Sequence, residues 1–139
     1  MEDKEKVLDF IKGCKLAVLS TVSAKNTSES AVLEFGQTDE LEIIFDCFES
    51  AKKYNNLQTN PNVSVVIGWD ENITVQYEGV AKEVFGEEKN KYQELYWQKN
   101  PDARRWADRE GIKYFKIVPT WIRYSDLNEK PWKIIELGF

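Results

Sequence analysis

Six stretches of alternating or β-branched residues, separated by polar turns, set the strongest constraint on the fold. Period-two patterning marks the strands, and Gly, Asn, Asp and Pro mark the breaks between them. The six stretches are residues 15–23, 28–35, 41–48, 63–69, 73–84 and 113–125. Hairpin-like connections favour antiparallel pairing, and closure of the sheet removes exposed strand edges. The sequence therefore predicts a mainly β fold with α+β elements, built as a six-stranded antiparallel barrel.

Helical patterns flank these strands and predict peripheral helices. Residues 3–13 carry apolar side chains at helical spacing and end at Gly13, and residues 86–100 show a second helical pattern. A short helix follows to Trp106, and the tail regains strand character at residues 134–137. The run 63–69 is nearly all apolar, which predicts a strand covered on both faces.

Composition excludes several classes of protein. A chain of 139 residues predicts a single domain over residues 1–139, and 42% hydrophobic with 31% charged residues is a globular balance. The net charge of −5 argues against a nucleic-acid partner. No apolar run is long enough to span a bilayer and no signal peptide is recognised, so we expect no membrane association and a cytoplasmic location.

The chain contains no histidine. This absence excludes Ser-His-Asp and Cys-His catalysis, histidine metal sites and histidine ligation of haem. Cys14 and Cys47 lie far apart without metal-ligand spacing, so no metal site is predicted and both thiols are expected to be reduced. A cofactor with its own reactivity is then the natural route to chemistry.

Between residues 45 and 67 the pattern runs from a strand through a turn at Ser50 into a short helix that stops at Asn60-Pro61. A helix begins with unpaired N–H groups and positive dipole charge, which attract anions. Ser50 is a suitable cap residue, and Lys52 and Lys53 fall in the first turn, where acidic residues are usual. A bound phosphate would resolve this conflict. The alternative is a capped helix with solvated lysines, and Glu49 beside the turn favours that alternative.

Residues 53–61, with Lys53, Asn56-Leu57 and Asn60-Pro61 at matching spacing, resemble the pyridoxamine 5′-phosphate oxidase-like family of FMN-binding split barrels. The order of elements extends the resemblance over residues 7–125. The resemblance implies a split β-barrel that binds FMN at a homodimer interface. Ser50 and Lys53 would hold the phosphate with Lys52 as a second cation, although the Ser-x-Lys spacing alone would select Lys52.

The same resemblance implies contacts to the flavin from the strands. Phe45 and Cys47 belong to the strand before the turn, and the second strand, with Ser30 and Val32, would run beside the isoalloxazine ring. Gln76 would hydrogen-bond the flavin, and Trp121 would pack against it. From the residues alone, Gln76 also fits an exposed polar face, Trp121 a core or interface role, and Cys47 a buried apolar position. The catalytic residues cannot be assigned.

The leading hypothesis is an FMN-dependent oxidoreductase that acts on a nicotinamide or another small molecule. It is not expected to oxidise vitamin B6, because the family's C-terminal Arg-x-His element is missing. A second hypothesis is a non-catalytic flavin-binding, storage or stress-related electron-carrier module. A third is a related barrel that binds haem or a deazaflavin, and a fourth is a small β protein without a cofactor. The absorbance spectrum of the purified protein would separate those hypotheses that differ in the bound cofactor.

Overall fold

The computed structural model describes residues 2–139, which form one antiparallel sheet of eight strands with three α-helices and a 3₁₀-helix. The strands are β1 (Leu16–Val22), β2 (Ser28–Glu34), β3 (Gly36–Gln37), β4 (Ile43–Phe48), β5 (Asn62–Ile67), β6 (Ile73–Glu83), β7 (Ile112–Asp126) and β8 (Lys133–Gly138). The helices are α1 (Asp3–Lys12), α2 (Lys52–Thr59), α3 (Gly86–Lys99) and the 3₁₀-helix η1 (Pro101–Trp106).

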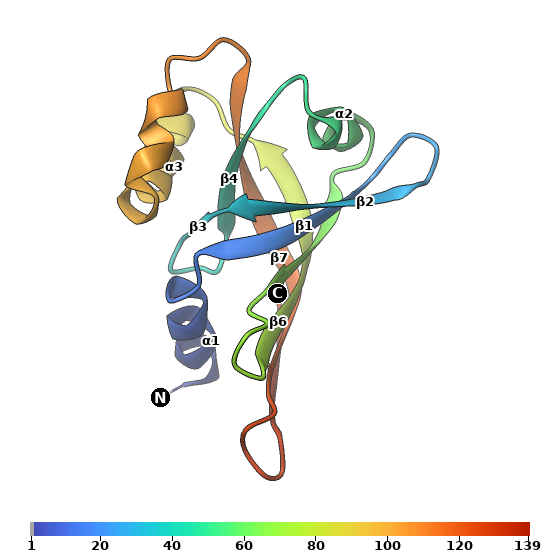
Figure 1. Ribbon diagram of the computed structural model, residues 1–139, viewed down its shortest axis with the longest axis vertical. Helices are drawn as coiled ribbons and strands as arrows, with labels where there is room; N and C mark the ends of the chain where they lie inside the picture. The colour runs from blue at the N-terminus through green and yellow to red at the C-terminus, as the bar shows by residue number, and fades with distance from the viewer. Residues whose placement is uncertain (1) are drawn as a thin grey trace.

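The sheet curls into a half-barrel. Its strand order is β2-β1-β5-β6-β7-β4-β3, and β8 pairs with β7 outside this path. The two end strands, β2 and β3, are separated in the chain by Phe35 alone, so the sheet bends until its ends meet in one segment. Figure 1 shows β1 and β2 crossing the long β6 and β7. The predicted antiparallel split barrel with peripheral helices is confirmed, and the strand character predicted at residues 134–137 is strand β8. Strand β3 is added to the predicted strands.

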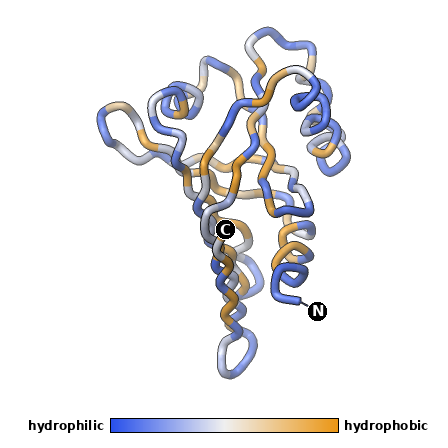
Figure 2. Tube along the Cα trace, turned by 180° about the vertical axis from the view of Figure 1, so that it is seen from behind, coloured by the Kyte–Doolittle hydropathy of each residue, from blue (hydrophilic) through white to orange (hydrophobic). Residues whose placement is uncertain are grey.

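Apolar side chains of alternate strand residues fill the inside of the curl, and the polar residues gather on the helices and the turns (Figure 2). The rings of Phe45 and Phe115 stack there with centroids 5.2 Å apart. The buried Tyr77 hydroxyl lies 2.7 Å from the carbonyl oxygen of Leu41, which satisfies a polar atom inside the core. A second apolar cluster lies under α3 and includes Tyr92, Tyr96 and Tyr114.

Strand β5 is buried on one face only. Its residues alternate between exposed and buried from Asn62 to Ile67, and 38% of Val66 is exposed. The prediction that both faces are covered is therefore wrong for residues 2–139, because alternate residues of β5 are exposed on its outer face. Residues 36–37 form strand β3 rather than part of the predicted turn, and the bend follows at Leu41, where φ is 66°. No helix within residues 2–139 is long and apolar enough to cross a bilayer.

Lys99, at the end of α3, fastens this helix to two other elements. Its Nζ donates to the Ile11 carbonyl oxygen at 3.2 Å and to Gln37 Oε1 at 2.6 Å. The ammonium also lies 3.7 Å from the centre of the Phe35 ring. Burial lowers the pKa of Lys99 to about 8, with a smaller opposing effect from Cys14. The ammonium therefore connects α3 to α1 and β3, although burial makes its charged form less favourable than in water.

This lowered pKa predicts that the free energy of unfolding rises with pH above about 8. Between about 8 and 10 the unfolded chain holds a proton on Lys99 that the folded chain has released, so higher pH favours folding. Solvent screening reduces the gain to about 1–2 kcal/mol. The buried Cys47 thiol, whose pKa burial raises to about 12, opposes this contribution above about pH 9, because the unfolded chain loses that proton first. Burial also raises the pKa of Tyr77 and Tyr96, which adds to the opposition at higher pH.

Urea unfolding of the wild type and of Lys99→Met at intervals from pH 7.5 to 10 measures this contribution. The free energy of unfolding of the wild type relative to Lys99→Met is expected to rise over this range, because both proteins retain the cysteines and tyrosines and differ only in Lys99. Equal pH dependence in both proteins would show that Lys99 is not the titrating group.

Candidate functional site

The turn between β4 and α2 places two lysines at the start of a helix. The Glu49 N–H donates to the Gly111 carbonyl oxygen at 2.8 Å, and the Ala51 N–H donates to the Phe48 carbonyl oxygen at 3.0 Å. These bonds put Ala51 at the cap position, and α2 begins at Lys52 with no acidic residue in its first turn. Without a side-chain cap, the first amides of α2 are available to an external anion.

Ser50 does not cap this helix, contrary to the local prediction. It lies one residue before the cap position, is exposed, and makes no side-chain hydrogen bond within residues 2–139. The sequence suggested Ser50 because serine is a frequent cap, whereas the bonds that fix the turn select Ala51. The predicted contact of Ser50 with a phosphate stays a prediction.

A cavity of about 180 Å³ lies between α2 and the β1–β2 hairpin. We call it the phosphate corner, and its polar lining consists of Thr21, Glu29, Ser30, Lys52 and Lys53. Figure 1 shows α2 beside this hairpin, although the two are separated in sequence by β3 and β4. The structure therefore brings Lys52 and Lys53 together with Ser30 around one cavity.

The two lysines are not equivalent. Lys52 Nζ lies 3.1 Å from Glu29 Oε2, while Lys53 forms no ion pair within residues 2–139. Glu29 is held in turn by Asn56, whose Nδ2 donates to Glu29 Oε1 at 2.6 Å and to Thr21 Oγ1 at 2.9 Å. The Asn56 hydrogen bond and then Lys52 lower the pKa of Glu29. A phosphate in the corner would therefore find the Lys53 ammonium without a carboxylate partner, whereas Glu29 already neutralises Lys52.

Thr21, Glu29 and Asn56 were not assigned roles from the sequence. Asn56 belongs to the matching segment, but its partners lie 27 and 35 residues away on β1 and β2. No local spacing signals such a bond. The three residues fasten the N-terminal half of α2 to the hairpin, which fixes the lysines against β1 and β2.

The outer face of the sheet next to the corner carries an apolar row. Val18 on β1 is paired with Val32 on β2 and with Val66 on β5, and we call these residues the valine row. Val32 is 62% exposed, which is unusual for an apolar residue in a strand. A depression of about 350 Å³ on this face shares Thr21 with the phosphate corner. The corner therefore adjoins a partly apolar surface that this chain leaves open.

Gln76 and Trp121 also lie on the outer face. Gln76 is exposed, neighbours Val66 across the strands, and is paired on its other side with Arg123. Trp121 is half-buried, and the Arg123 guanidinium lies 5.8 Å from its ring centre. Arg123 forms an ion pair with Glu136 on the neighbouring strand β8. Neither Gln76 nor Trp121 lines the phosphate corner, so their contact with a flavin stays a prediction.

Phe45 and Cys47 point into the barrel core. Phe45 is fully buried against Phe115, and Cys47 is buried beside it on β4. Burial raises the pKa of the Cys47 thiol to about 12, although the Lys53 charge acts in the opposite direction. Both residues support the strand that leads to the turn, and their predicted contact with the flavin stays a prediction. No group of acidic and cysteine side chains within residues 2–139 is arranged to hold a metal ion.

Comparisons with known proteins agree with this architecture. The general stress protein 26 of Bacillus anthracis str. Sterne is 26% identical, with a TM-score of 0.76 over 99% of this chain and 100% of that chain. A putative pyridoxamine 5′-phosphate oxidase of Listeria innocua is 22% identical, with a TM-score of 0.73 over 88% of this chain and 98% of that chain. A haem-binding protein of Mycobacterium smegmatis is 13% identical with a TM-score of 0.86.

The match covers 99% of this chain but only 58% of the haem-binding protein, so that comparison shows the fold alone. A search of curated proteins gave no significant match. The fold is that of a split barrel of the pyridoxamine 5′-phosphate oxidase type. A family model described as pyridoxamine 5′-phosphate oxidase matches residues 3–126, and the chain belongs to this family. The resemblance drawn from residues 53–61 is thereby confirmed.

Proposed function

We propose that this protein is a homodimeric FMN-binding oxidoreductase with one FMN-binding domain over residues 1–139. The observation that carries the proposal is the phosphate corner, where Lys53 stands without an ion pair at an uncapped helix start. Bound there, FMN would supply hydride or electron transfer at its flavin ring. Lys53 and the first amides of α2 would bind the phosphate, with Lys52 as a second cation and Ser50 near the same turn.

The size of the corner supports a site shared by two subunits. Its volume of about 180 Å³ suits a phosphate and part of a ribityl chain, but sites for whole molecules of this size usually enclose roughly 300–1,000 Å³. The flavin ring therefore needs a further surface. The valine row, Gln76 and Trp121 lie on the open outer face, where a second copy would complete the enclosure.

Binding of FMN and of riboflavin to the apoprotein tests the proposal. We expect FMN to bind at least about tenfold more tightly, because only FMN offers a charged acceptor to the corner. Equal affinities would refute the phosphate assignment. Mass spectrometry of the chromophore released from the purified protein identifies the natural ligand, and haem or no ligand there would refute the choice of FMN.

The non-catalytic flavin carrier is the second candidate. Its supporting observation is that the pKa of Glu29, the one carboxyl group lining the corner, is lowered, so it does not hold a proton near neutral pH. Anaerobic NADH or NADPH separates the two candidates. Bleaching of the flavin supports turnover, whereas an unchanged spectrum with both nucleotides supports storage or electron carriage. The substrate and the cytoplasmic location stay predictions.

A charged residue in the valine row tests the dimer. Val32→Asp is expected to shift the protein from dimer to monomer in sedimentation at micromolar concentration and to weaken FMN binding, because it places a carboxylate in the proposed interface. Ala24→Asp, in the exposed β1–β2 turn, is the matched control and should change neither. A Val32→Asp protein that remains dimeric would place the interface elsewhere.

A further inference from the structure

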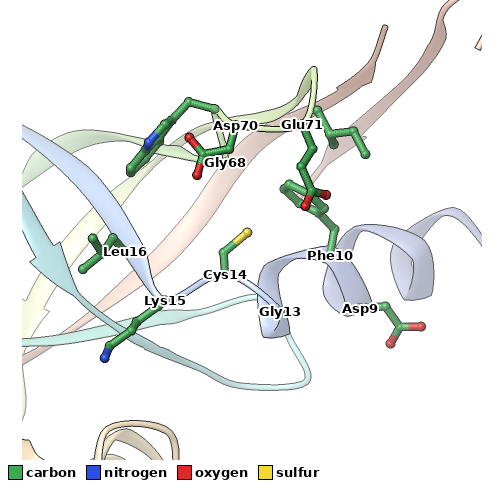
Figure 3. Close-up of a pocket in the computed structure, with 11 residues that line it drawn as sticks. Asp9, Phe10, Gly13, Cys14, Lys15, Leu16, Gly68, Asp70 and Glu71 are labelled. Atoms are coloured by element: carbon green, nitrogen blue, oxygen red, sulfur yellow. The ribbon is translucent and has the colours of Figure 1, made fainter. Parts of the chain in front are cut away.

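A further cavity lies away from the phosphate corner and shares no lining residue with it. It measures about 470 Å³ and lies between the C-terminal end of α1 and the β5–β6 turn. Figure 3 shows the Cys14 sulfur facing the turn that carries Asp70 and Glu71. We call it the acidic cavity. Its volume is sufficient for a small organic molecule.

The walls of the acidic cavity are apolar and partly aromatic. Phe10 and Leu16 line it from α1 and β1, and Trp69 lines it from the β5–β6 turn. Gly68 holds this turn close to α1: its φ is 83°, and a Cβ there would lie 2.5 Å from the Phe10 ring. The turn therefore packs directly on the ring, which fixes the two walls relative to each other. Trp69 is 49% exposed, so much of its surface is available to a ligand.

The charges around the cavity are mainly negative. Asp9, Asp70 and Glu71 line it, and within residues 2–139 none of these carboxylates forms an ion pair or a side-chain hydrogen bond. The single lining cation, Lys15, lies 3.9 Å from Glu34 and points away from the cavity in Figure 3. Burial raises the pKa of the Cys14 thiol, Lys99 opposes this, and Glu71 and Asp70 add to it. Among the charges that act on Cys14, Lys99 therefore has the largest effect, and the two carboxylates of the turn oppose it.

These features select the chemical class of the ligand. Carboxylates beside tryptophan and phenylalanine rings attract an organic cation both by charge and by the ring faces. No group of acidic and cysteine side chains in the described residues has metal-holding geometry, which leaves an organic cation rather than a metal ion. We propose that the acidic cavity binds a small organic cation with an apolar body, such as a protonated amine on an aromatic or aliphatic skeleton. This site is independent of the proposed flavin site.

Calorimetric titration with three ligands of one skeleton tests the proposal: 2-phenylethylammonium, 2-phenylethanol and phenylacetate. We expect the cation to bind at least about tenfold more tightly than the alcohol, and phenylacetate to bind most weakly. Asp70→Asn/Glu71→Gln should remove the preference for the cation. Asp108→Asn/Glu110→Gln, which changes two exposed acidic residues in the loop before β7, is the matched control and should retain it.

Cys14 provides a second readout inside the cavity. A thiolate displaces methanesulfinate from a methanethiosulfonate reagent and forms a mixed disulfide, so rates with a cationic and an anionic reagent report the local charge. Cys47 is buried with its pKa raised to about 12, which confines the reaction to Cys14. The ratio of cationic to anionic rates should fall in Asp70→Asn/Glu71→Gln, because the two carboxylates are lost while Lys99 remains. Phenylethylammonium should slow the reaction.

Equal affinity for the three ligands would overturn the proposal. So would a Cys14 rate ratio that is the same in the wild type and in Asp70→Asn/Glu71→Gln, or a Cys14 that reacts with neither reagent, because the carboxylates would then not act on the cavity or the cavity would be closed. Loss of cation binding in the control variant would assign the effect to net charge. Each of these results is independent of FMN binding, so the proposed flavin site can stand or fall separately.

Discussion

In a variant with Lys53 replaced by glutamate, we expect the dissociation constant for FMN to rise by about 100-fold or more. The substitution removes the ammonium that has no ion pair in the phosphate corner and puts a carboxylate in its place. The phosphate dianion would then meet Glu29 and the new carboxylate together. Fluorescence titration of the apoprotein with FMN measures the change. Riboflavin, which lacks the phosphate, should lose little affinity in the same variant.

Three comparison variants sharpen this test. Lys53→Met removes the charge without adding a new one and should weaken FMN by about tenfold, which guards against misfolding of the glutamate variant. Lys52→Met should cost less, because Glu29 already neutralises Lys52. Glu29→Gln should strengthen FMN binding, since the amide oxygen can still accept from Asn56 while the repulsion is gone. Unchanged FMN retention in Lys53→Glu, with the fold intact, would refute the phosphate assignment.

Gly79→Ala is expected to lower the free energy of unfolding by about 2–4 kcal/mol. Gly79 lies on β6 where the register with β7 shifts, and β7 packs tightly on it. A Cβ at Gly79 would lie 2.5 Å from the Val118 carbonyl oxygen and 2.7 Å from Ile117 Cγ2. Backbone cannot move aside as a side chain can, so the strand pair itself must separate. Urea unfolding gives the difference directly.

Gly138→Ala is the matched control for this substitution. Gly138 is also a strand glycine, on β8, and a Cβ there has no neighbour within 4 Å among the described residues. We expect a change within about 0.5 kcal/mol. If Gly79→Ala had the same free energy of unfolding as Gly138→Ala, β6 and β7 would not approach each other closely at Gly79.

Strand positions were predictable because burial follows the period-two pattern. The alternation of β6, with Val75 and Tyr77 inward and Gln76 outward, is the one read from the sequence. Helix α1 ends where Gly13 predicted it would. Strand β3 was not predictable, since two residues carry no period and its pairing with β4 depends on the curl of the whole sheet.

The candidate site was predictable only in part. The two lysines at a helix start could be read locally, because neighbours in sequence determine a helix terminus. The ion pair of Lys52 with Glu29 could not, since it joins residues 23 positions apart through the packing of α2 on the hairpin. The cap at Ala51 likewise depends on the carbonyl of Gly111, which is remote in the chain. A contact between residues far apart in sequence thus neutralises Lys52 and leaves Lys53 without an ion pair within residues 2–139.

Phe35 is the junction at which the first and last strands of the curled sheet meet, and α3 holds it from outside. The Asn100 side chain donates to the Phe35 carbonyl oxygen at 2.8 Å, and the Lys99 ammonium covers the ring. The C-terminal end of α3 therefore fixes the junction between β2 and β3. Loss of these contacts would uncover the junction between β2 and β3, the two end strands of the sheet, so self-association through strand edges should begin there rather than at the hairpin tips.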